Sequence, residues 1–371
     1  MKISSKNITT AFLQKADIEV NGNRDWDIQI HNPKFYTRVL KSGTMGLGEA
    51  HMEKWWDCER LDLFFEKLLR ANTTELPNWQ LFLTKLRARL FNAQSLKNAK
   101  KVAKNHYDLG NDLYMSFLDP YNQYTCGYFR DTSDLNEAQE KKLDLICRKL
   151  QLKKDDKVLD IGCGWGGFAK YAAEHYGCQV TGISISDEQI AYAKEFTKGL
   201  PVIIQKQDYR EMTGQFDKIV SIGMIEHVGY KNYKAFMKKV ASLLKDDGLF
   251  LLQTIGRNNS VTMANPWIDK YIFPGGMIPS LKQIGSAAEN LLMIEDLHNF
   301  GLYYYKTLLA WEENFRKNYS SLPSKKYDEK FYRMWRYYLL SCAGGFKSRH
   351  MHLWQFVFSK GKLKDMYISI R

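Results

Sequence analysis

The order of apolar segments in the second half of the chain predicts an α/β fold, with a doubly wound, mostly parallel sheet and helices on both faces. A buried strand, a glycine-rich loop and the start of an amphipathic helix follow one another in VLDIGCGWGGFAKY, residues 158–171. Short apolar or β-branched runs come next, and helical stretches separate most of them. These runs are residues 178–185, 202–205, 216–223 and 248–255. An alternating run at 353–361 follows a long helical region and is expected to form a late antiparallel strand.

The N-terminal residues, 1–90, predict a small, mainly helical domain. They carry paired aromatic and apolar side chains, as in HMEKWWDCERLDLFFEKLLRA, and contain the turn-like segment NTTELPN. A basic linker at 91–105 and a large α/β domain at 106–371 complete the predicted organisation. Within the large domain, Asp134 is expected to cap a helix that extends to Leu152.

The charge of the chain favours an anionic partner. Its formal net charge is +13, which attracts nucleic acid, an anionic lipid surface or an acidic substrate. Seven Lys or Arg residues and no acidic residue lie between Lys85 and Lys104. Apolar residues recur at helical spacing in the same region, namely Trp79, Phe82, Leu83, Leu86 and Leu90. The segment is either a basic amphipathic helix that lies on anionic lipid or a linker helix with its basic face in water.

The N-terminus lacks an apolar run of signal-peptide length, and no later run is long enough to span a bilayer. We therefore expect a cytoplasmic protein. The six cysteines form no C-x-x-C pair and no ligand spacing with the eight histidines. Neither a metal site nor a disulfide framework is predicted.

The glycine-rich loop fits two kinds of nucleotide site. Gly162, Gly164 and Gly167 satisfy the G-x-G-x-x-G pattern of dinucleotide binders. Asp160, followed by Gly162, Gly164 and Gly166, satisfies the looser pattern of S-adenosylmethionine binders. The glycines alone do not choose between the two.

The end of the second strand, TGISISDEQ, argues against a dehydrogenase. Ser186 and Gln189 have the spacing of a capping box, which places Asp187 and Glu188 in the first helical turn, where they complement the helix dipole. The ribose is then left to Ser184 and Gln189. That arrangement is uncommon for a dehydrogenase, which usually offers a carboxylate there.

Three further residues favour S-adenosylmethionine. Asp208 follows the third strand and is placed for the adenine edge, with Tyr209 available to stack on the ring. Glu226 follows the fourth strand and is expected at the carboxyl edge of the sheet, facing the reacting end of the cofactor. The alternative interpretation of Glu226 is an ordinary exposed loop acid.

Several motifs together carry a resemblance that the glycine loop cannot. In chain order they are LGEAHMEKWWDCERLD, HYDLGNDLY, QYTCGYF, VLDIGCGWGG, IVSIGMIEHVG, WIDKYIFPGG, HNFGLYY and LLSCAGGFKSR. The chain resembles the bacterial cyclopropane-fatty-acyl-phospholipid synthases and, more distantly, the mycolic acid cyclopropane synthases. The resemblance implies a Rossmann-like methyltransferase fold in the 106–371 catalytic domain. It implies transfer of a methylene group from S-adenosylmethionine to a cis double bond of a phospholipid acyl chain, on an anionic membrane surface and by a homodimer.

The resemblance also implies a bound bicarbonate ion that removes a proton while the ring closes. Carried over by position, the ion contacts Glu226, Tyr304, the backbones at Cys126 and Ile255, and the residue at 253. Glu226 is expected to accept the hydroxyl proton of the ion, and Tyr304 to donate to it. Gln253 stands where the family has histidine; it can donate a hydrogen bond but cannot carry positive charge. Cys126 is expected to act through its backbone rather than as a nucleophile.

The resemblance places Tyr124 and Thr125 at the amino-acid end of the cofactor, beside Gly162 and Gly164. Aromatic rings such as those of Tyr124 and Tyr304 can stabilise a cation. Two other functions stay open at this point. One is a methyltransferase acting on another lipid, a small molecule or RNA, although the sequence shows no aromatic and basic platform for nucleic acid. The other is a lipid-binding protein with a degenerate cofactor site.

Overall fold

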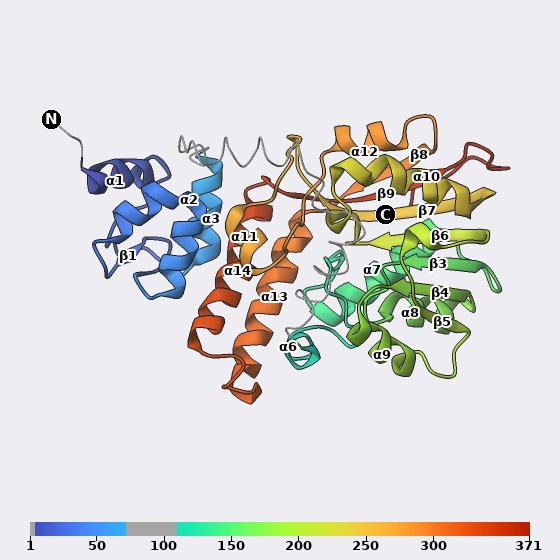
Figure 1. The fold of residues 1–371 in the computed structure, drawn as a ribbon, viewed down its shortest axis with the longest axis horizontal. Helices are drawn as coiled ribbons and strands as arrows, with labels where there is room; N and C mark the ends of the chain where they lie inside the picture. Colours follow the sequence, from blue (N-terminus) through green and yellow to red (C-terminus); the bar gives the residue numbers. More distant parts are fainter. Residues whose placement is uncertain (1–3, 72–109) are drawn as a thin grey trace. The chain divides into compact units, whose positions relative to one another are not determined.

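A computed structural model of the chain describes residues 4–71 and 110–371, and these form two compact units (Figure 1). Among the described residues, unit 1 comprises 4–71, 263–274 and 304–351, and unit 2 comprises 110–262, 275–303 and 352–371. Two segments that the sequence placed in the 106–371 domain therefore pack with the N-terminal residues. Lipid docking or dimerisation by residues 1–90 and catalysis by residues 106–371 stay predictions. The basic 85–104 segment and its apolar residues lie outside the described residues.

Unit 1 is mainly helical, as predicted. Its elements are α1 (Ser5–Lys15), β1 (Gln29–Ile30), α2 (Phe35–Met52), β2 (Trp56–Asp57), α3 (Leu61–Arg70), α11 (Pro266–Tyr271), α13 (Leu302–Asn318), η4 (Tyr319–Ser321) and α14 (Glu329–Lys347). Trp56 is fully buried and packs on the rings of Phe64 and Tyr337. A Cβ on Gly344 of α14 would lie 2.6 Å from the Asp62 carbonyl oxygen of α3, so a glycine lets these two helices approach closely. No helix among the described residues is long and apolar enough to cross a bilayer.

Unit 2 is built on a seven-stranded sheet with the order β5-β4-β3-β6-β7-β9-β8. Its strands are β3 (Lys157–Ile161), β4 (Gln179–Ser184), β5 (Val202–Lys206), β6 (Phe216–Ile222), β7 (Leu244–Gly256), β8 (Met293–Asn299) and β9 (His352–Ser359). The first five run parallel, and β9 pairs antiparallel with both β7 and β8. The predicted strands and the late antiparallel strand are confirmed, whereas β8 was missed because its sequence, MIEDLHN, lacks apolar alternation.

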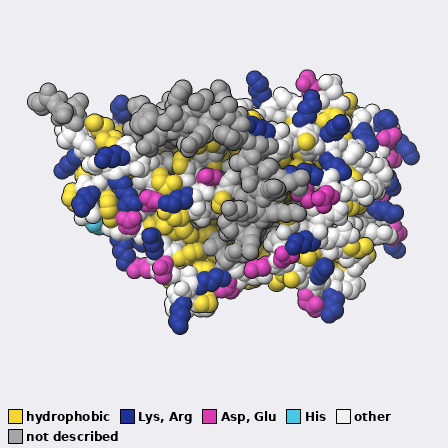
Figure 2. Space-filling model, viewed as in Figure 1, with side chains coloured by type: hydrophobic (Ala, Val, Ile, Leu, Met, Phe, Trp, Pro, Cys, Tyr) yellow, Lys and Arg dark blue, Asp and Glu magenta, His cyan; other side chains and the backbone are white. Residues whose placement is uncertain are grey.

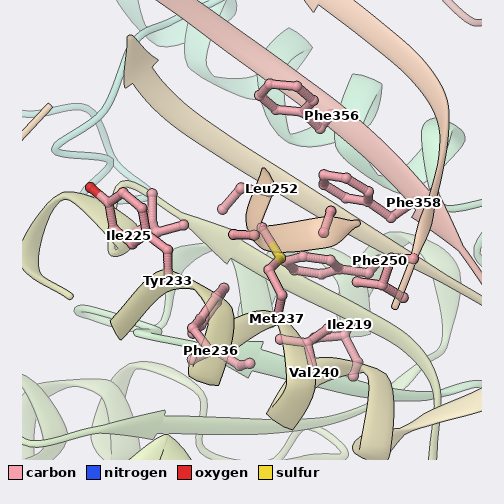
Figure 3. Close-up of a cluster of buried hydrophobic side chains, with 14 of the residues drawn as sticks. Ile219, Ile225, Tyr233, Phe236, Met237, Val240, Phe250, Leu252, Phe356 and Phe358 are labelled. Carbon is pink, nitrogen blue, oxygen red and sulfur yellow. The ribbon is translucent and has the colours of Figure 1, made fainter. Parts of the chain in front are cut away.

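Helices cover both faces of this sheet, which confirms the doubly wound fold. The helices of unit 2 are α6 (Asn111–Met115), α7 (Leu135–Lys149), α8 (Gly167–Tyr176), α9 (Asp187–Phe196), η1 (Tyr209–Glu211), η2 (Ile225–His227), η3 (Tyr230–Asn232), α10 (Tyr233–Leu243) and α12 (Leu281–Ala288). On one face, α7 and α8 pack through Leu143 and Phe168 against Leu251. On the other, α10 directs Phe236 and other apolar side chains toward Phe250 and its neighbours (Figure 3).

Two predicted helix starts have the expected caps. Asp134 accepts a hydrogen bond from the backbone N–H of Glu137 at 2.9 Å, and α7 begins at the next residue. Ser186 accepts from the N–H of Gln189 at 3.4 Å, and α9 begins at Asp187. Each cap satisfies a backbone donor that the first helical turn leaves without a partner.

Gly167, the first residue of α8, is required by close packing. A Cβ there would lie 1.9 Å from the carbonyl oxygen of Tyr121 and 2.3 Å from Gln123 Nε2. We expect Gly167→Ala to lower the free energy of unfolding by about 1–3 kcal/mol, because the backbone must move. Chemical denaturation measures this change. Gly285→Ala in α12 is the control, since a Cβ there meets nothing within 4 Å, and it should be neutral or stabilising. Equal effects of the two changes contradict the packing argument.

Candidate active site

The glycine loop leaves one stretch of backbone open to a ligand. Gly162, Gly164 and Gly166 have φ values of +84°, +55° and +85°, the left-handed region that favours glycine. A Cβ on Gly162 would contact Met224, whereas a Cβ on Gly164 would meet nothing within 4 Å. Gly164 therefore lies against free space at the carboxyl edge of the sheet, where α/β folds bind nucleotides.

Asp160, in β3 just before this loop, is a buried acid with a free oxygen. The residue is 2% exposed, and its Oδ2 atom has no hydrogen-bond partner among the described residues. Burial raises the pKa of Asp160 to about 7, and the positive charge of Lys142 opposes the rise. Because a buried polar atom without a partner is costly, Oδ2 suits a donor supplied by a ligand.

At the predicted ribose position, Ser184 and Gln189 lie together. The Ser184 hydroxyl donates to Gln189 Oε1 at 3.3 Å. Asp187 pairs instead with Lys206, and Asp187 and Glu188 occupy the first turn of α9, as the capping argument predicted. The pair Ser184 and Gln189 therefore stays available as the predicted ribose contact.

The predicted adenine residues already have protein partners. Both oxygens of Asp208 accept from the Arg210 guanidinium, at 2.8 Å from Nε and 2.6 Å from Nη2. The Tyr209 ring packs edge-on against Phe236, with the Arg210 guanidinium 5.5 Å from its centroid. Sequence reasoning did not foresee Arg210, which holds Asp208 in place. The adenine contacts of Asp208 and Tyr209 stay predictions.

Glu226, in η2 after β6, is a second buried acid with a free oxygen. It is 9% exposed, so the alternative interpretation as an exposed loop acid is wrong. Its Oε1 atom accepts the backbone N–H of Ile255 at 2.7 Å, and its Oε2 atom has no partner among the described residues. Burial raises the pKa of Glu226 to about 7, despite this hydrogen bond. The Ile255 N–H, predicted as part of an ion cradle, is thus used to hold Glu226.

Gln253 offers a donor near the same end of β7. The residue is buried, and its Oε1 atom accepts from Nε2 of Gln355, its Cα partner on β9, at 2.9 Å. Gln253 Nε2 has no partner among the described residues. A free acceptor on Glu226 and a free donor on Gln253 therefore belong to neighbouring positions at the carboxyl end of the sheet.

The segment that carries Tyr124, Thr125 and Cys126 is held by α7. Gln139 Nε2 donates to the Thr125 carbonyl at 2.8 Å, and Lys142 Nζ donates to the Thr125 hydroxyl at 3.1 Å. Gln139 and Lys142 were not predicted from the sequence, although they are two polar residues three positions apart on an otherwise apolar helix face.

Tyr124 and Cys126 make further contacts within unit 2. The Tyr124 ring packs edge-on against Tyr114 and Phe117. The buried Cys126 thiol contacts the carbonyl oxygen of Gly127 at 3.2 Å. Both side chains therefore have local packing partners in unit 2.

Tyr304 belongs to unit 1, in α13. Its ring stacks on Phe346 with centroids 4.5 Å apart and meets Trp311 edge-on. The other predicted ion contacts belong to unit 2, so the place of Tyr304 in the ion site stays a prediction.

Comparison with known proteins agrees with this architecture. Residues 94–356 match the family model described as mycolic acid cyclopropane synthetase. This chain belongs to the cyclopropane synthase family. It is 50% identical to the cyclopropane-fatty-acyl-phospholipid synthase of Escherichia coli K12, over 95% of this chain and 93% of that protein. It is 30% identical to the tuberculostearic acid methyltransferase UfaA1 of Mycobacterium tuberculosis, over 88% and 81%. The resemblance drawn from the motifs is confirmed.

Solved structures of the family share the fold. The mycolic acid cyclopropane synthase CmaA1, complexed with SAH and CTAB, matches with a TM-score of 0.65 and 30% identity, over 70% of this chain and 97% of that one. The cyclopropane synthase MmaA2 from Mycobacterium tuberculosis matches with a TM-score of 0.66 and 28% identity, over 70% and 98%. These matches identify the fold as that of the S-adenosylmethionine-dependent methyltransferases, as predicted.

Glu226→Gln tests the buried carboxyl. Because burial raises the pKa of Glu226 from 4.5 to about 7, the wild-type protein loses stability as the pH rises through this interval. A glutamine at this position does not ionise, so the variant does not lose this stability as the pH rises. We expect the stability of the variant relative to wild type to increase by up to about 3 kcal/mol between about pH 4 and about pH 8. Thermal or chemical unfolding at several pH values measures it.

The matched control is Glu211→Gln, which replaces an exposed acid of η1. Its stability relative to wild type should vary little over the same range. A difference between Glu226→Gln and wild type that does not change with pH contradicts the argument.

Proposed function

We propose that this chain transfers a methylene group from S-adenosylmethionine to a cis double bond of an unsaturated phospholipid acyl chain and closes a cyclopropane ring. The observation that carries the proposal is the near full-length match to the Escherichia coli cyclopropane-fatty-acyl-phospholipid synthase. The buried acceptor of Glu226 and donor of Gln253, beside the open glycine loop, fit that chemistry.

The residues around the loop fit the cofactor. Gly164 allows close approach to the backbone, and Asp160 offers a free carboxylate oxygen. We assign the ribose to Ser184 and Gln189. The remaining assignments follow the resemblance: Gly162, Tyr124 and Thr125 for the amino-acid end, and Asp208 and Tyr209 for adenine. When bound, S-adenosylmethionine supplies a methyl group on a sulfonium centre.

The chain must make a weak nucleophile react and must keep water out. An alkene attacks a methyl group slowly unless the two are aligned in a dry site. Attack leaves a carbocation on the lipid, which water would capture. The residues assigned to this step are buried, among them Cys126, Gln253 and Glu226. Aromatic faces stabilise such a cation without attacking it, a role we assign to Tyr124 and Tyr304.

Ring closure requires a base, and we assign that role to a bicarbonate ion. The free Oε2 of Glu226 is suited to accept the hydroxyl of the ion, and the free Nε2 of Gln253 to donate to an ion oxygen. Tyr304 and the backbone at Cys126 complete the cradle in this proposal. Ile255 contributes by orienting Glu226 through its N–H. The Cys126 thiol forms no bond with the lipid.

We further propose that the enzyme is a homodimer and works peripherally on the inner, anionic face of the membrane. The net charge of +13 supports attraction to anionic lipid. On the face seen in Figure 2, Lys and Arg side chains are interspersed with Asp and Glu, so no single described patch there accounts for the excess. The predicted 85–104 segment is the richest basic stretch of the sequence.

Incubation of the protein with S-adenosylmethionine and vesicles of unsaturated phosphatidylglycerol tests the activity. We expect S-adenosylhomocysteine and a lipid that gains CH2 and loses its alkene proton signals. Zwitterionic vesicles of the same acyl composition are the control for surface charge and should react more slowly.

A lipid that gains CH2 but keeps an alkene contradicts ring closure. That outcome favours the second candidate, a lipid methyltransferase, to which the relative named tuberculostearic acid methyltransferase points. Absence of any modified lipid contradicts both.

Gln253→His tests the departure from the family pattern. Histidine can carry charge, whereas the Gln253 amide donates without charge. We therefore expect the variant to change the bicarbonate concentration needed for half-maximal rate and the pH profile of turnover. Rates measured in bicarbonate-depleted and bicarbonate-supplemented buffer give both quantities. If neither changes, residue 253 does not contact the ion.

A further inference from the structure

Two buried glutamines face each other across the sheet, at positions where the alternation of the strands would place apolar side chains. Gln253 of β7 and Gln355 of β9 are Cα partners in an antiparallel pair and are 1% and 0% exposed. The next pair on the same face, Leu251 and Val357, belongs to the apolar cluster beneath α7 and α8. A buried amide is costly unless both its donor and its acceptor are paired.

The two amides satisfy each other only in part. Nε2 of Gln355 donates to Oε1 of Gln253 at 2.9 Å. Gln253 Nε2 and Gln355 Oε1 have no partner among the described residues. A pair of apolar side chains would avoid both unpaired atoms, because replacing both partners of a hydrogen bond by apolar groups of the same shape can be nearly neutral for stability. Packing alone therefore does not explain why two glutamines stand here.

The hydrogen bond decides which end of the Gln253 amide is free. A glutamine amide keeps nearly the same shape after a half-turn, which exchanges its acceptor with its donor. If Gln253 alone reversed, its Nε2 would meet Nε2 of Gln355, so two donors would lie together and the bond would be lost. A donor on the Gln253 carbonyl oxygen also polarises the amide and strengthens its N–H groups as donors. Gln355 thus keeps the donor of Gln253 available to a ligand.

An anion is the ligand that this orientation suits. The oxygens of an anion accept hydrogen bonds from N–H groups, and a carbonyl oxygen turned toward them would repel them. The reversed amide would present such an oxygen. The orientation of Gln253 therefore determines whether this position attracts or repels an anion.

We propose that Gln355 is a positioning residue, which holds the Gln253 amide with its donor turned toward the bicarbonate ion. The inference rests on the ion site of the proposed function, and Gln355 itself makes no contact with the ion. It acts through the one hydrogen bond that joins the two side chains.

Binding of bicarbonate without turnover tests this role. Isotope-labelled bicarbonate is titrated into the protein in the presence of S-adenosylhomocysteine, and carbon NMR line broadening gives the dissociation constant of the ion. We expect Gln355→Met to raise this constant about threefold to tenfold, because Gln253 loses the hydrogen bond that orients it. The affinity for S-adenosylhomocysteine should change by less than about twofold, since the bond to Gln253 does not involve the cofactor residues.

Gln179→Met is the matched control. It makes the same substitution at the start of β4, whereas Gln253 lies near the end of β7. It should leave the dissociation constant of bicarbonate unchanged. Gln355→Leu is the second variant, because it also removes the donor and guards against poor folding of the methionine variant.

A double substitution separates orientation from a merely structural effect. In a Gln253→Met background, Gln355→Met should weaken the ion no further, since no amide remains to be oriented. A structural role of Gln355 predicts the same weakening in both backgrounds. An unchanged ion constant in both Gln355 variants, an equal loss of S-adenosylhomocysteine affinity, or full additivity with Gln253→Met would overturn the proposal.

Ion binding is measured separately from turnover, so the two proposals can fail independently. A wild-type protein that binds bicarbonate but makes no cyclopropane lipid defeats the proposed function, and weaker ion binding in Gln355→Met still supports the role of Gln355. A protein that makes the lipid but binds no bicarbonate, or whose Gln355→Met variant binds it as tightly as wild type, leaves methylene transfer standing and defeats this inference. A protein that does neither defeats both.

Discussion

The burial of two carboxyl groups without full partners is the constraint on which the rest of unit 2 depends. Asp160 and Glu226 each keep one oxygen without a partner among the described residues, and burial raises both pKa values to about 7. A folded protein tolerates such groups only where the surrounding structure is strong enough to offset their cost. The charge of Lys142 opposes the rise of the pKa of Asp160, and the Ile255 N–H donates a hydrogen bond to Glu226.

The sheet brings these two acids to one edge. Asp160 is in β3 and Glu226 follows β6, and these strands are neighbours in the centre of the sheet. From β3 the chain continues to β4 and β5 on one side and then returns to place β6 on the other side of β3. The boundary between β3 and β6 is therefore the topological switch point at which α/β folds bind nucleotides. Apolar layers on both faces, with Phe250 and Leu251 on opposite sides of β7, keep this part of the sheet dry. The strand order thus accounts both for the position of Asp160 and Glu226 at one edge of the sheet and for their burial.

Much of this arrangement could be predicted from local patterns. The strands of the parallel sheet, the cap at Asp134 and the place of Glu226 follow from periodicity and from where parallel strands end. Strand β8 could not be predicted, because an edge strand that is half exposed needs no apolar alternation. Lys142 was missed because a lysine in a helix is normally exposed, and the hydrogen bond that its buried ammonium donates to Thr125, 17 residues earlier, is not visible in the helical pattern.

The same reasoning explains why the division of the chain was harder to predict. Residues 304–351 lie between β8 and β9 in the sequence yet pack with the N-terminal helices, where Gly344 meets the backbone of Asp62. The only sign of such a close approach of two helix backbones in the sequence is a glycine. Glycines also occur for many other reasons, such as turns and helix ends. The compact units therefore depend on long-range packing that no local pattern records.

Difference infrared spectroscopy on the addition of S-adenosylhomocysteine measures whether the buried carboxyl of Asp160 responds to the ligand. It is carried out about one unit below the pKa of about 7, where most Asp160 is protonated in the ligand-free protein. We expect that ligand binding removes a protonated carboxyl band and that this loss is absent in Asp160→Asn. A carboxyl spectrum that does not change on ligand binding, or that changes equally in Asp160→Asn, would contradict it.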